Sequence, residues 1–344
     1  MKYHLINTLD YELFGNGSGC LNSCVLRPTD AYIDCCDNYG ARATIFVDTL
    51  EFDAIQRCDK TYASAETTNA ITSQLQQLGH SQHNLQLHLH PQWKDANFYN
   101  HIWQLDYSLW RIGDLNYSTI DKLIKNGLKF LGQFSNKPII AFRAGGWAIQ
   151  PSSNTIKALN NNGLLIDSTV APNLINNASG DWYDFRKSPA LSFWHIQDDV
   201  CRPQGSGLLE VPITTAKIGF RKHFSAMRES KAVPGLPDGC MGTYDGPNSG
   251  LQALRGKASK VLNMGTVMLD ISTLPDWALI HATQRYMKCS SEPTPVPIVT
   301  IGHNKNFTEH SRKNFNNYLR WAKAQPEIIF SDYSQWLQVY NESK

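Results

Sequence analysis

Two pairs of ionisable residues have the spacing of side chains that share one face of a β-strand. Asp10 and Glu12 are separated by one residue, and so are His88 and His90. Because side chains alternate across a strand, both members of each pair point to the same side. Two imidazoles and one or two carboxylates that converge can bind Zn²⁺ or a similar divalent cation. The spacing therefore predicts a metal site.

Other ionisable residues stand at or near the ends of further predicted strands. Arg143 and His303 each close such a strand, and Asp167 lies within another. The carboxyl ends of the strands of an α/β barrel meet at one mouth, where active sites are built. We therefore expect these residues to surround a single pocket together with the two pairs.

The elements that must position these residues follow from the hydrophobic pattern. Short apolar runs predict strands at 3–10, 43–49, 85–90, 138–143, 164–170, 208–213, 297–303 and 328–331. Segments with a 3.6-residue period lie between these runs. This alternation predicts a parallel sheet, either open or closed into a barrel.

Four helices have recognisable ends. One covers 71–78 and is expected to end at Gly79, and another begins at Ser118. A third covers 153–162 and is closed by Gly163, while Thr308 is a plausible N-cap for the fourth. Residues 214–292 interrupt the alternation with loops rich in Gly and Pro. We interpret the chain as a single domain in which this segment is a large insertion that forms a wall of the site.

The composition excludes some classes of protein. Of the residues, 42% are hydrophobic and 18% are charged, and the net charge is only +2, which argues against nucleic-acid binding. The N-terminus has no apolar segment typical of a signal peptide, and no run of about 18 apolar residues could span a bilayer. We therefore expect a cytoplasmic protein whose eight cysteines are reduced.

Five segments, in their order along the chain, resemble the five motifs of the polysaccharide deacetylases, the NodB homology family of carbohydrate esterases. They are TLDYE (8–12), HLHP (88–91), FRAGGW (142–147), IDSTV (166–170) and IGH (301–303). The resemblance extends over nearly the whole chain. It implies a distorted (β/α) barrel of about seven parallel strands, with a large insertion before the last catalytic strand.

The resemblance also implies a role for each residue. Asp10 would take a proton from the attacking water, and Glu12 would bind the metal, expected to be zinc, together with the two histidines. Arg143 would keep Asp10 ionised through a charge-assisted hydrogen bond, and Asp167 would position Arg143. His303 would protonate the departing amine.

The segments depart from the usual family pattern in three places. Tyr11 separates two carboxylates that are usually adjacent. The histidines are two residues apart rather than four, and the position four before His90 is Gln86. Gly145 replaces the usual proline of the third motif.

Three residues near the motifs are candidates for substrate contact. Trp93 and Trp147 lie beside the second and third motifs, and Arg186 lies in an aromatic-rich loop after the strand predicted at 164–170. Aromatic packing is the alternative for both tryptophans.

The resemblance implies a hydrolase that removes an N-acyl group, expected to be N-acetyl, from an amino sugar. If the protein is cytoplasmic, a nucleotide- or lipid-linked precursor of surface polysaccharide such as O-antigen is the natural substrate. Removal of a formyl group is close chemistry. The alternatives are an amidohydrolase, whose superfamily also has His-x-His at a strand end, and a carbohydrate-binding scaffold without activity.

Overall fold

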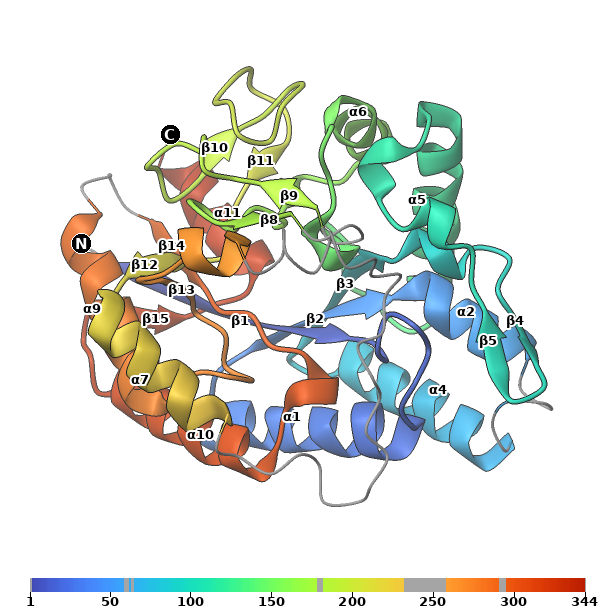
Figure 1. Cartoon of the computed structure of the whole chain (residues 1–344), viewed down its shortest axis with the longest axis horizontal. Coiled ribbons are helices and arrows are strands. Elements are labelled where there is room, and N and C mark those ends of the chain that lie inside the picture. Colours follow the sequence, from blue (N-terminus) through green and yellow to red (C-terminus); the bar gives the residue numbers. More distant parts are fainter. Residues whose placement is uncertain are drawn as a thin grey trace.

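The computed structural model describes residues 2–58, 62, 65–177, 182–231, 258–290 and 295–343. Within this part of the chain the main feature is a nine-stranded sheet with the order β10-β11-β7-β6-β3-β2-β1-β14, in which β15 pairs with the first half of β1 (Figure 1). The strands are β1 (Tyr3–Tyr11), β2 (Ala43–Asp48), β3 (Asn84–Leu89), β6 (Ala141–Ala144), β7 (Ile166–Asp167), β10 (Trp194–His195), β11 (Leu209–Glu210), β14 (Val296–Val299) and β15 (Ile328–Phe330). Every pair is parallel except β10 with β11. The sheet curls into a distorted barrel, so the predicted fold class is confirmed.

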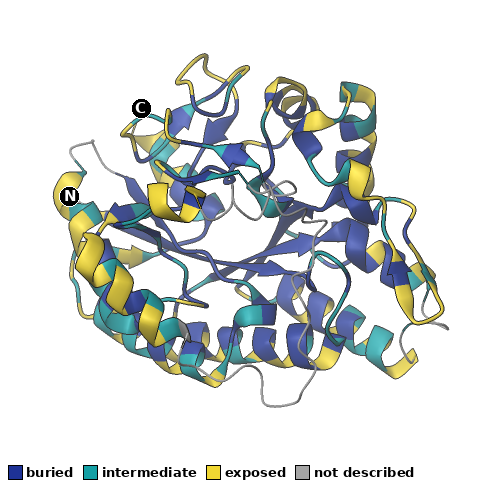
Figure 2. Ribbon diagram, viewed as in Figure 1, coloured by how far each residue is buried: buried dark blue, intermediate teal, exposed yellow. Residues whose placement is uncertain are grey.

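Helices cover the outside of the sheet. They are α1 (Arg27–Tyr39), α2 (Thr49–Arg57), α4 (Ala65–His80), α5 (Tyr117–Leu131), α6 (Ser153–Asn161), α7 (Phe220–Lys231), α9 (Asp276–Cys289), α10 (Glu309–Lys323) and α11 (Tyr333–Glu342). In Figure 1, α1, α4 and α10 lie below the strands, and α5 and α6 lie at the upper right. All residues of β1, β2 and β3 are buried, as expected for parallel strands covered on both faces (Figure 2). None of the helices in the described part of the chain is both long and apolar enough to cross a membrane.

Short elements form the loops around this barrel. Three small antiparallel pairs are β4 (Asn97–Tyr99) with β5 (Ile102–Gln104), β8 (Ile175–Asn176) with β9 (Tyr183–Asp184), and β12 (Thr215–Lys217) with β13 (Thr266–Met268). The single-turn helices are η1 (Asn22–Leu26), η2 (Pro91–Trp93), η3 (Tyr107–Leu109), η4 (Ile112–Asp114), η5 (Gly145–Trp147) and η6 (Asn304–Asn306).

Two of the predicted helix ends are wrong, and each has a physical reason. Gly79 lies inside α4, which ends at His80, rather than at the end of the helix. A Cβ at Gly79 would overlap the carbonyl oxygen of Phe134. The glycine therefore permits close packing and does not cap the helix. At α5 the N-cap is Asn116, whose side chain accepts a hydrogen bond from the backbone of Thr119, so Ser118 lies in the first turn.

The other two helix ends are confirmed. Gly163 has a φ of +76° shortly after the end of α6, a conformation that favours glycine. The hydroxyl of Thr308 accepts a hydrogen bond from the backbone of Ser311, and the two residues form a capping box at the start of α10.

The strands on one side of the barrel are much shorter than predicted. Only two residues each of β7 and β11 form a ladder, although strands were predicted at 164–170 and 208–213. Backbone hydrogen bonds continue more loosely beyond the ladder, from Val211 N to Asp167 O at 2.8 Å and from Ile213 N to Val170 O at 2.9 Å.

The segment predicted as an insertion bridges the remaining side of the sheet. Thr214 N donates to Val299 O at 3.0 Å, and Ile301 N donates to Leu269 O at 3.0 Å. Residues just before β12 and just after β13 therefore form backbone hydrogen bonds with the chain at the end of β14, and in this way they connect the β11 side of the sheet to β14. The middle of the proposed insertion, 232–257, and residues 291–294 lie outside the described residues, so the single-domain division stays a prediction.

Candidate active site

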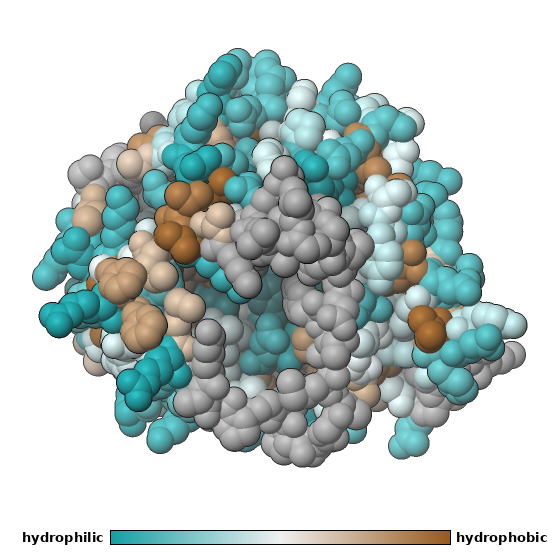
Figure 3. All heavy atoms as spheres, in the orientation of Figure 1, coloured by the Kyte–Doolittle hydropathy of each residue, from teal (hydrophilic) through white to brown (hydrophobic). Residues whose placement is uncertain are grey.

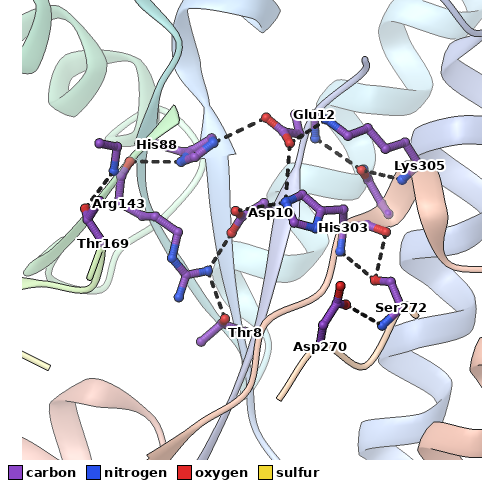
Figure 4. Close-up of polar contacts among 12 residues, drawn as sticks. Thr8, Asp10, Glu12, His88, Arg143, Thr169, Asp270, Ser272, His303 and Lys305 are labelled. Atoms are coloured by element: carbon purple, nitrogen blue, oxygen red, sulfur yellow. Dashed lines mark hydrogen bonds and ion pairs between the residues drawn. The ribbon is translucent and has the colours of Figure 1, made fainter. Parts of the chain in front are cut away.

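The carboxyl ends of the central strands bring ionisable side chains into one buried cluster (Figure 4). The cluster contains Asp10 and Glu12 at the end of β1, His88 and His90 at the end of β3, Arg143 in β6, and His303 beyond β14. Asp10 and His303 are paired directly through a parallel β-bridge. In the orientation of Figure 1, hydrophilic atoms lie at the base of a hollow near the centre of the face shown in Figure 3.

Glu12, His88 and His90 form a set of possible metal ligands. Oε2 of Glu12 lies 3.3 Å from Nε2 of His88 and 2.9 Å from Nε2 of His90. The three ligand atoms all lie within 4.8 Å of one another. Nδ1 of His88 lies 2.9 Å from the carbonyl oxygen of Arg143, so Nδ1 carries a proton for that bond and Nε2 can offer its lone pair to a metal. Two imidazoles and one carboxylate suit zinc and leave a coordination position open.

Gln86, four residues before His90, has a structural role in this protein. Gln86, where the family usually has the first histidine, accepts hydrogen bonds from the backbone of Ile140 at 2.9 Å and Ala141 at 2.7 Å. It therefore fixes the start of β6. Gly145 is also required, because a Cβ at this position would overlap the ring of His90.

Tyr11 explains how two carboxylates can act together although they are not adjacent. Its ring lies on the opposite face of β1, where the hydroxyl donates to Gln74 of α4 at 2.9 Å and the ring packs on Phe52. Asp10 and Glu12 consequently both reach the inside of the barrel.

A buried lysine lies against Glu12. Nζ of Lys305 is 2.7 Å from Oε1 of Glu12 and 2.9 Å from the carbonyl oxygen of Leu13. Burial acts to raise the pKa of Glu12, but the Lys305 ammonium, the charge of His90 and side-chain hydrogen bonds with His88 and His90 hold that pKa well below its usual value. Glu12 is therefore ionised.

Asp10 is paired with Arg143, as predicted. Nη1 of Arg143 lies 2.6 Å from Oδ1 of Asp10, and both side chains are buried. The guanidinium is held in place by the hydroxyl of Thr8 at 2.9 Å and by the carbonyl oxygen of Ser168 at 2.9 Å. It also lies 4.2 Å from the ring centre of Phe46.

The assignment of Asp167 as the residue that positions Arg143 is corrected. Ser168, the next residue, holds the guanidinium through its carbonyl and hydroxyl oxygens. Asp167 instead accepts a hydrogen bond from the hydroxyl of Thr169 at 2.5 Å and pairs with Glu210 across the β7–β11 ladder. Thr169 in turn accepts from Ala144 N at 3.0 Å, so Asp167 supports the end of β6.

His303 faces both carboxylates from the other side. Its Nε2 is 3.7 Å from Oδ2 of Asp10 and 3.9 Å from Oε1 of Glu12, which is beyond hydrogen-bond distance. Burial lowers the pKa of His303 despite these carboxylates, so its imidazole is neutral near pH 7. The backbone N–H of His303 donates to the hydroxyl oxygen of Ser272 at 2.7 Å. The carboxyl group of Asp270, in the same loop as Ser272, acts to raise the pKa of His303. The predicted insertion thus contributes two residues to the wall of the site.

The three candidates for substrate contact have different surroundings. The ring of Trp147 is half-buried and stands edge-on to that of His303, with centres 5.8 Å apart. Trp93 is 1% exposed and packs on Trp103, so its side chain belongs to the core and the substrate assignment is wrong. Arg186 is exposed and forms a bidentate pair with Asp184 of its own loop.

Sequence reasoning missed three charged residues of the cluster. Asp48 ends β2, caps α2 and accepts a hydrogen bond from His90 N at 3.3 Å. Its place at the end of a predicted strand, three residues before Glu51, is a signal that could have identified it. Asp270 and Lys305 give no such local signal, because their contacts with the site depend on how distant segments pack.

Comparison with known proteins places this geometry in a known fold. No family model matches the sequence, and no curated protein matches it. The structure is similar to that of a Mycobacterium smegmatis protein assigned as a polysaccharide deacetylase, with a TM-score of 0.54 and 12% identity over 99% of this chain and 91% of that one. A Pseudomonas aeruginosa protein with the same assignment gives a TM-score of 0.46 at 12% identity, again over 99% and 91% of the two chains. The chain therefore has the fold of the polysaccharide deacetylases, and at these identities the likeness concerns the fold alone.

Proposed function

We propose that this protein is a metal-dependent hydrolase that removes an N-acyl group, most simply acetyl, from an amino sugar. One observation carries the proposal. A ligand set of one carboxylate and two imidazoles lies beside an Asp10–Arg143 pair and His303, at the strand ends of this fold. The same buried space thus holds a candidate metal site, a candidate base and a candidate acid.

A divalent cation, of which zinc suits the donors best, would be held by Glu12, His88 and His90 and would supply Lewis-acid polarisation of the amide. The remaining steps belong to the side chains. Oδ2 of Asp10 is the free carboxylate oxygen that takes a proton from the attacking water, since Oδ1 is engaged by Arg143.

His303 acts on the leaving nitrogen. Because its imidazole is neutral before the reaction, it must gain a proton before it can donate one. Asp10 Oδ2 lies 3.7 Å from its Nε2, so the proton that Asp10 takes from the attacking water can pass to His303 and then to the leaving nitrogen. The ring of Trp147 flanks His303 and is our candidate for contact with the sugar.

The substrate we propose is an acylated amino sugar carried by a nucleotide or a lipid, as in the synthesis of surface polysaccharide. The cytoplasmic location remains a prediction from the sequence. Removal of a formyl group would use the same residues, so both acyl groups belong in the test.

The decisive experiment measures release of acetate and formate from free, nucleotide-linked and lipid-linked N-acyl amino sugars. We expect turnover that is lost in chelator and restored by zinc, and lost in His88→Ala together with bound metal. The matched control is His83→Ala, because His83 is an equally buried histidine one residue before β3 that pairs with Asp37 away from the cluster. Hydrolysis of simple amides but of no amino sugar would point instead to an amidohydrolase. Binding of sugars without any turnover would point to a scaffold.

A further inference from the structure

Lys305 is an unusual feature of a site built for a cation. It is only 3% exposed and follows His303 by two residues. A buried ammonium is costly unless it is paired, and its partners here are Oε1 of Glu12 and the carbonyl oxygen of Leu13. Its ring neighbour is Phe14, with the ring centre 5.7 Å away. The side chain of Lys305 therefore lies against Glu12 and its chain neighbours.

The two oxygens of Glu12 have separate partners. Oε1 lies 2.7 Å from the Lys305 ammonium, whereas Oε2 faces Nε2 of His88 (Figure 4). Oε2 also lies 2.9 Å from Nε2 of His90. A cation held between the imidazoles would meet Oε2 alone. The carboxylate therefore stands between the lysine on one side and the ligand position on the other.

The backbone keeps the lysine in this place. The side-chain oxygen of Asn304 accepts hydrogen bonds from Glu12 N at 3.3 Å and from Lys305 N at 2.8 Å. The turn that carries the lysine is thus tied to the residue that the lysine contacts. Movement of the ammonium away from Glu12 would separate two buried opposite charges, which is costly.

We propose that Lys305 is a resident counter-cation that shares Glu12 with the divalent metal. It orients the carboxylate before metal binds, and it limits Glu12 to one coordinating oxygen. The inference rests on the metal site of the proposed function, but it concerns the strength of binding and not the reaction.

The charges determine whether Lys305 strengthens or weakens metal binding. Without metal, Lys305 is a direct cationic partner of Glu12 at 2.7 Å, so it stabilises the empty site. With metal present, the ammonium and the divalent cation lie on opposite sides of one carboxylate and repel each other in a poorly screened interior. Lys305 thus stabilises the empty site more than the filled one. By linkage, its presence weakens metal binding.

The test is a titration of the metal-free protein with zinc alone, by competition with a chromogenic chelator, combined with thermal unfolding with and without zinc. Lys305→Met and Lys305→Gln remove the charge, and Gln retains a donor for Glu12 and Leu13. We expect both variants to bind zinc about tenfold more tightly than the unmodified protein. Both should also be less stable than it without zinc and gain more stability when zinc is added.

Lys137→Met is the matched control. Lys137 is a partly buried lysine that donates to the backbone oxygens of Ser81 and His83, away from the cluster. Its loss should lower stability without changing zinc affinity or the gain on adding zinc. This comparison separates the charge at Glu12 from the general effect of losing a lysine.

Other outcomes of these measurements also support or overturn the sharing of Glu12. If the Lys305 variants fold only in the presence of zinc, the metal is replacing the lost charge, as proposed. Zinc binding that is unchanged or weaker in both variants, or failure to fold even in saturating zinc, overturns the sharing of Glu12. Loss of zinc binding in His88→Ala, combined with zinc binding that is unchanged or weaker in the Lys305 variants, would leave the proposed hydrolase intact while this inference fails. If the unmodified protein and the Lys305 variants all fail to bind zinc, both proposals lose their metal site.

Discussion

Two pairs of buried carboxyl groups lie in the same barrel, and they differ in what surrounds them. Asp10 and Glu12 stand at the end of β1, and each faces a cation, Arg143 at 2.6 Å and Lys305 at 2.7 Å. The second pair joins β7 to β11, in register across the ladder, and consists of Asp167 and Glu210. All four carboxyl groups are 3% exposed or less.

The second pair has no cation at such a distance among the described residues. Burial raises the pKa of Asp167 to about 6, and burial together with Asp167 raises that of Glu210 well above its usual value. The two residues are in register across the ladder, and their raised pKa values favour a proton shared between the two carboxyl groups. Glu12, by contrast, has a lowered pKa in equally deep burial.

The difference shows that burial alone does not decide whether a carboxyl group can do chemistry. A neighbouring cation keeps the group ionised and available to a metal or a proton. A neighbouring carboxyl group instead favours a proton held by the pair, which then acts as a structural link. We expect substitutions to separate the two pairs in activity, in metal binding and in the pH dependence of stability.

The largest expected effect is on turnover. Asp10→Asn should lower kcat by about a hundredfold or more, because the amide cannot accept a proton from water, and it should keep the bound zinc. Asp167→Asn should retain most of the activity, because it preserves the acceptor oxygen for Thr169. Initial rates and metal content of both variants provide the measurement. Equal losses of rate would mean that the two carboxylates are not functionally distinct.

The second effect is on metal binding. Glu12→Gln should weaken zinc binding by about tenfold or more, because the amide is a poor ligand and no longer offsets the positive charge of Lys305. Excess zinc should partly restore its activity. Glu210→Gln is the matched change in the other pair and should leave zinc affinity as it is. If Asp10→Asn loses the metal and Glu12→Gln keeps it, the two roles are reversed.

The sequence predicted the first pair and its surroundings well because the relevant patterns are local. Alternation along a strand is enough to place Asp10 beside Glu12 and His88 beside His90. The role of Asp167 was assigned wrongly because residues 167 and 168 face different neighbours. Which of the two faces Arg143 depends on the register of a ladder only two residues long. Lys305 was missed because its contact with Glu12 joins residues 293 positions apart.

The sequence also overestimated the regularity of the second side of the barrel. Side chains replace part of the ladder there, as where Glu210 accepts a hydrogen bond from Val170 N at 3.0 Å. Such bonds have no periodic pattern, so a run of apolar residues around them resembles a longer strand. The regular strands carry the predicted ligands and base, and the irregular ones carry the supports that sequence reasoning could not assign.

The smallest expected effect is on the pH dependence of stability, and it tests the shared proton directly. A raised pKa in the folded state means that the folded protein binds more protons than the unfolded chain. The stabilising contribution of the protonated pair is therefore complete below about pH 4, near the unfolded values, and is lost as pH rises through about 6 for Asp167 and higher for Glu210. Glu210→Gln removes the need for this proton and still offers a donor to Asp167. Measured by urea unfolding, the free energy of unfolding of the variant relative to that of the unmodified protein should increase by on the order of 2 kcal/mol from pH 5 to pH 8. Glu309→Gln, at an exposed position in α10, should show no such gain. A difference between Glu210→Gln and the unmodified protein that stays constant from pH 5 to pH 8 would mean that the pair holds no extra proton, and the contrast with Glu12 would then rest on metal binding alone.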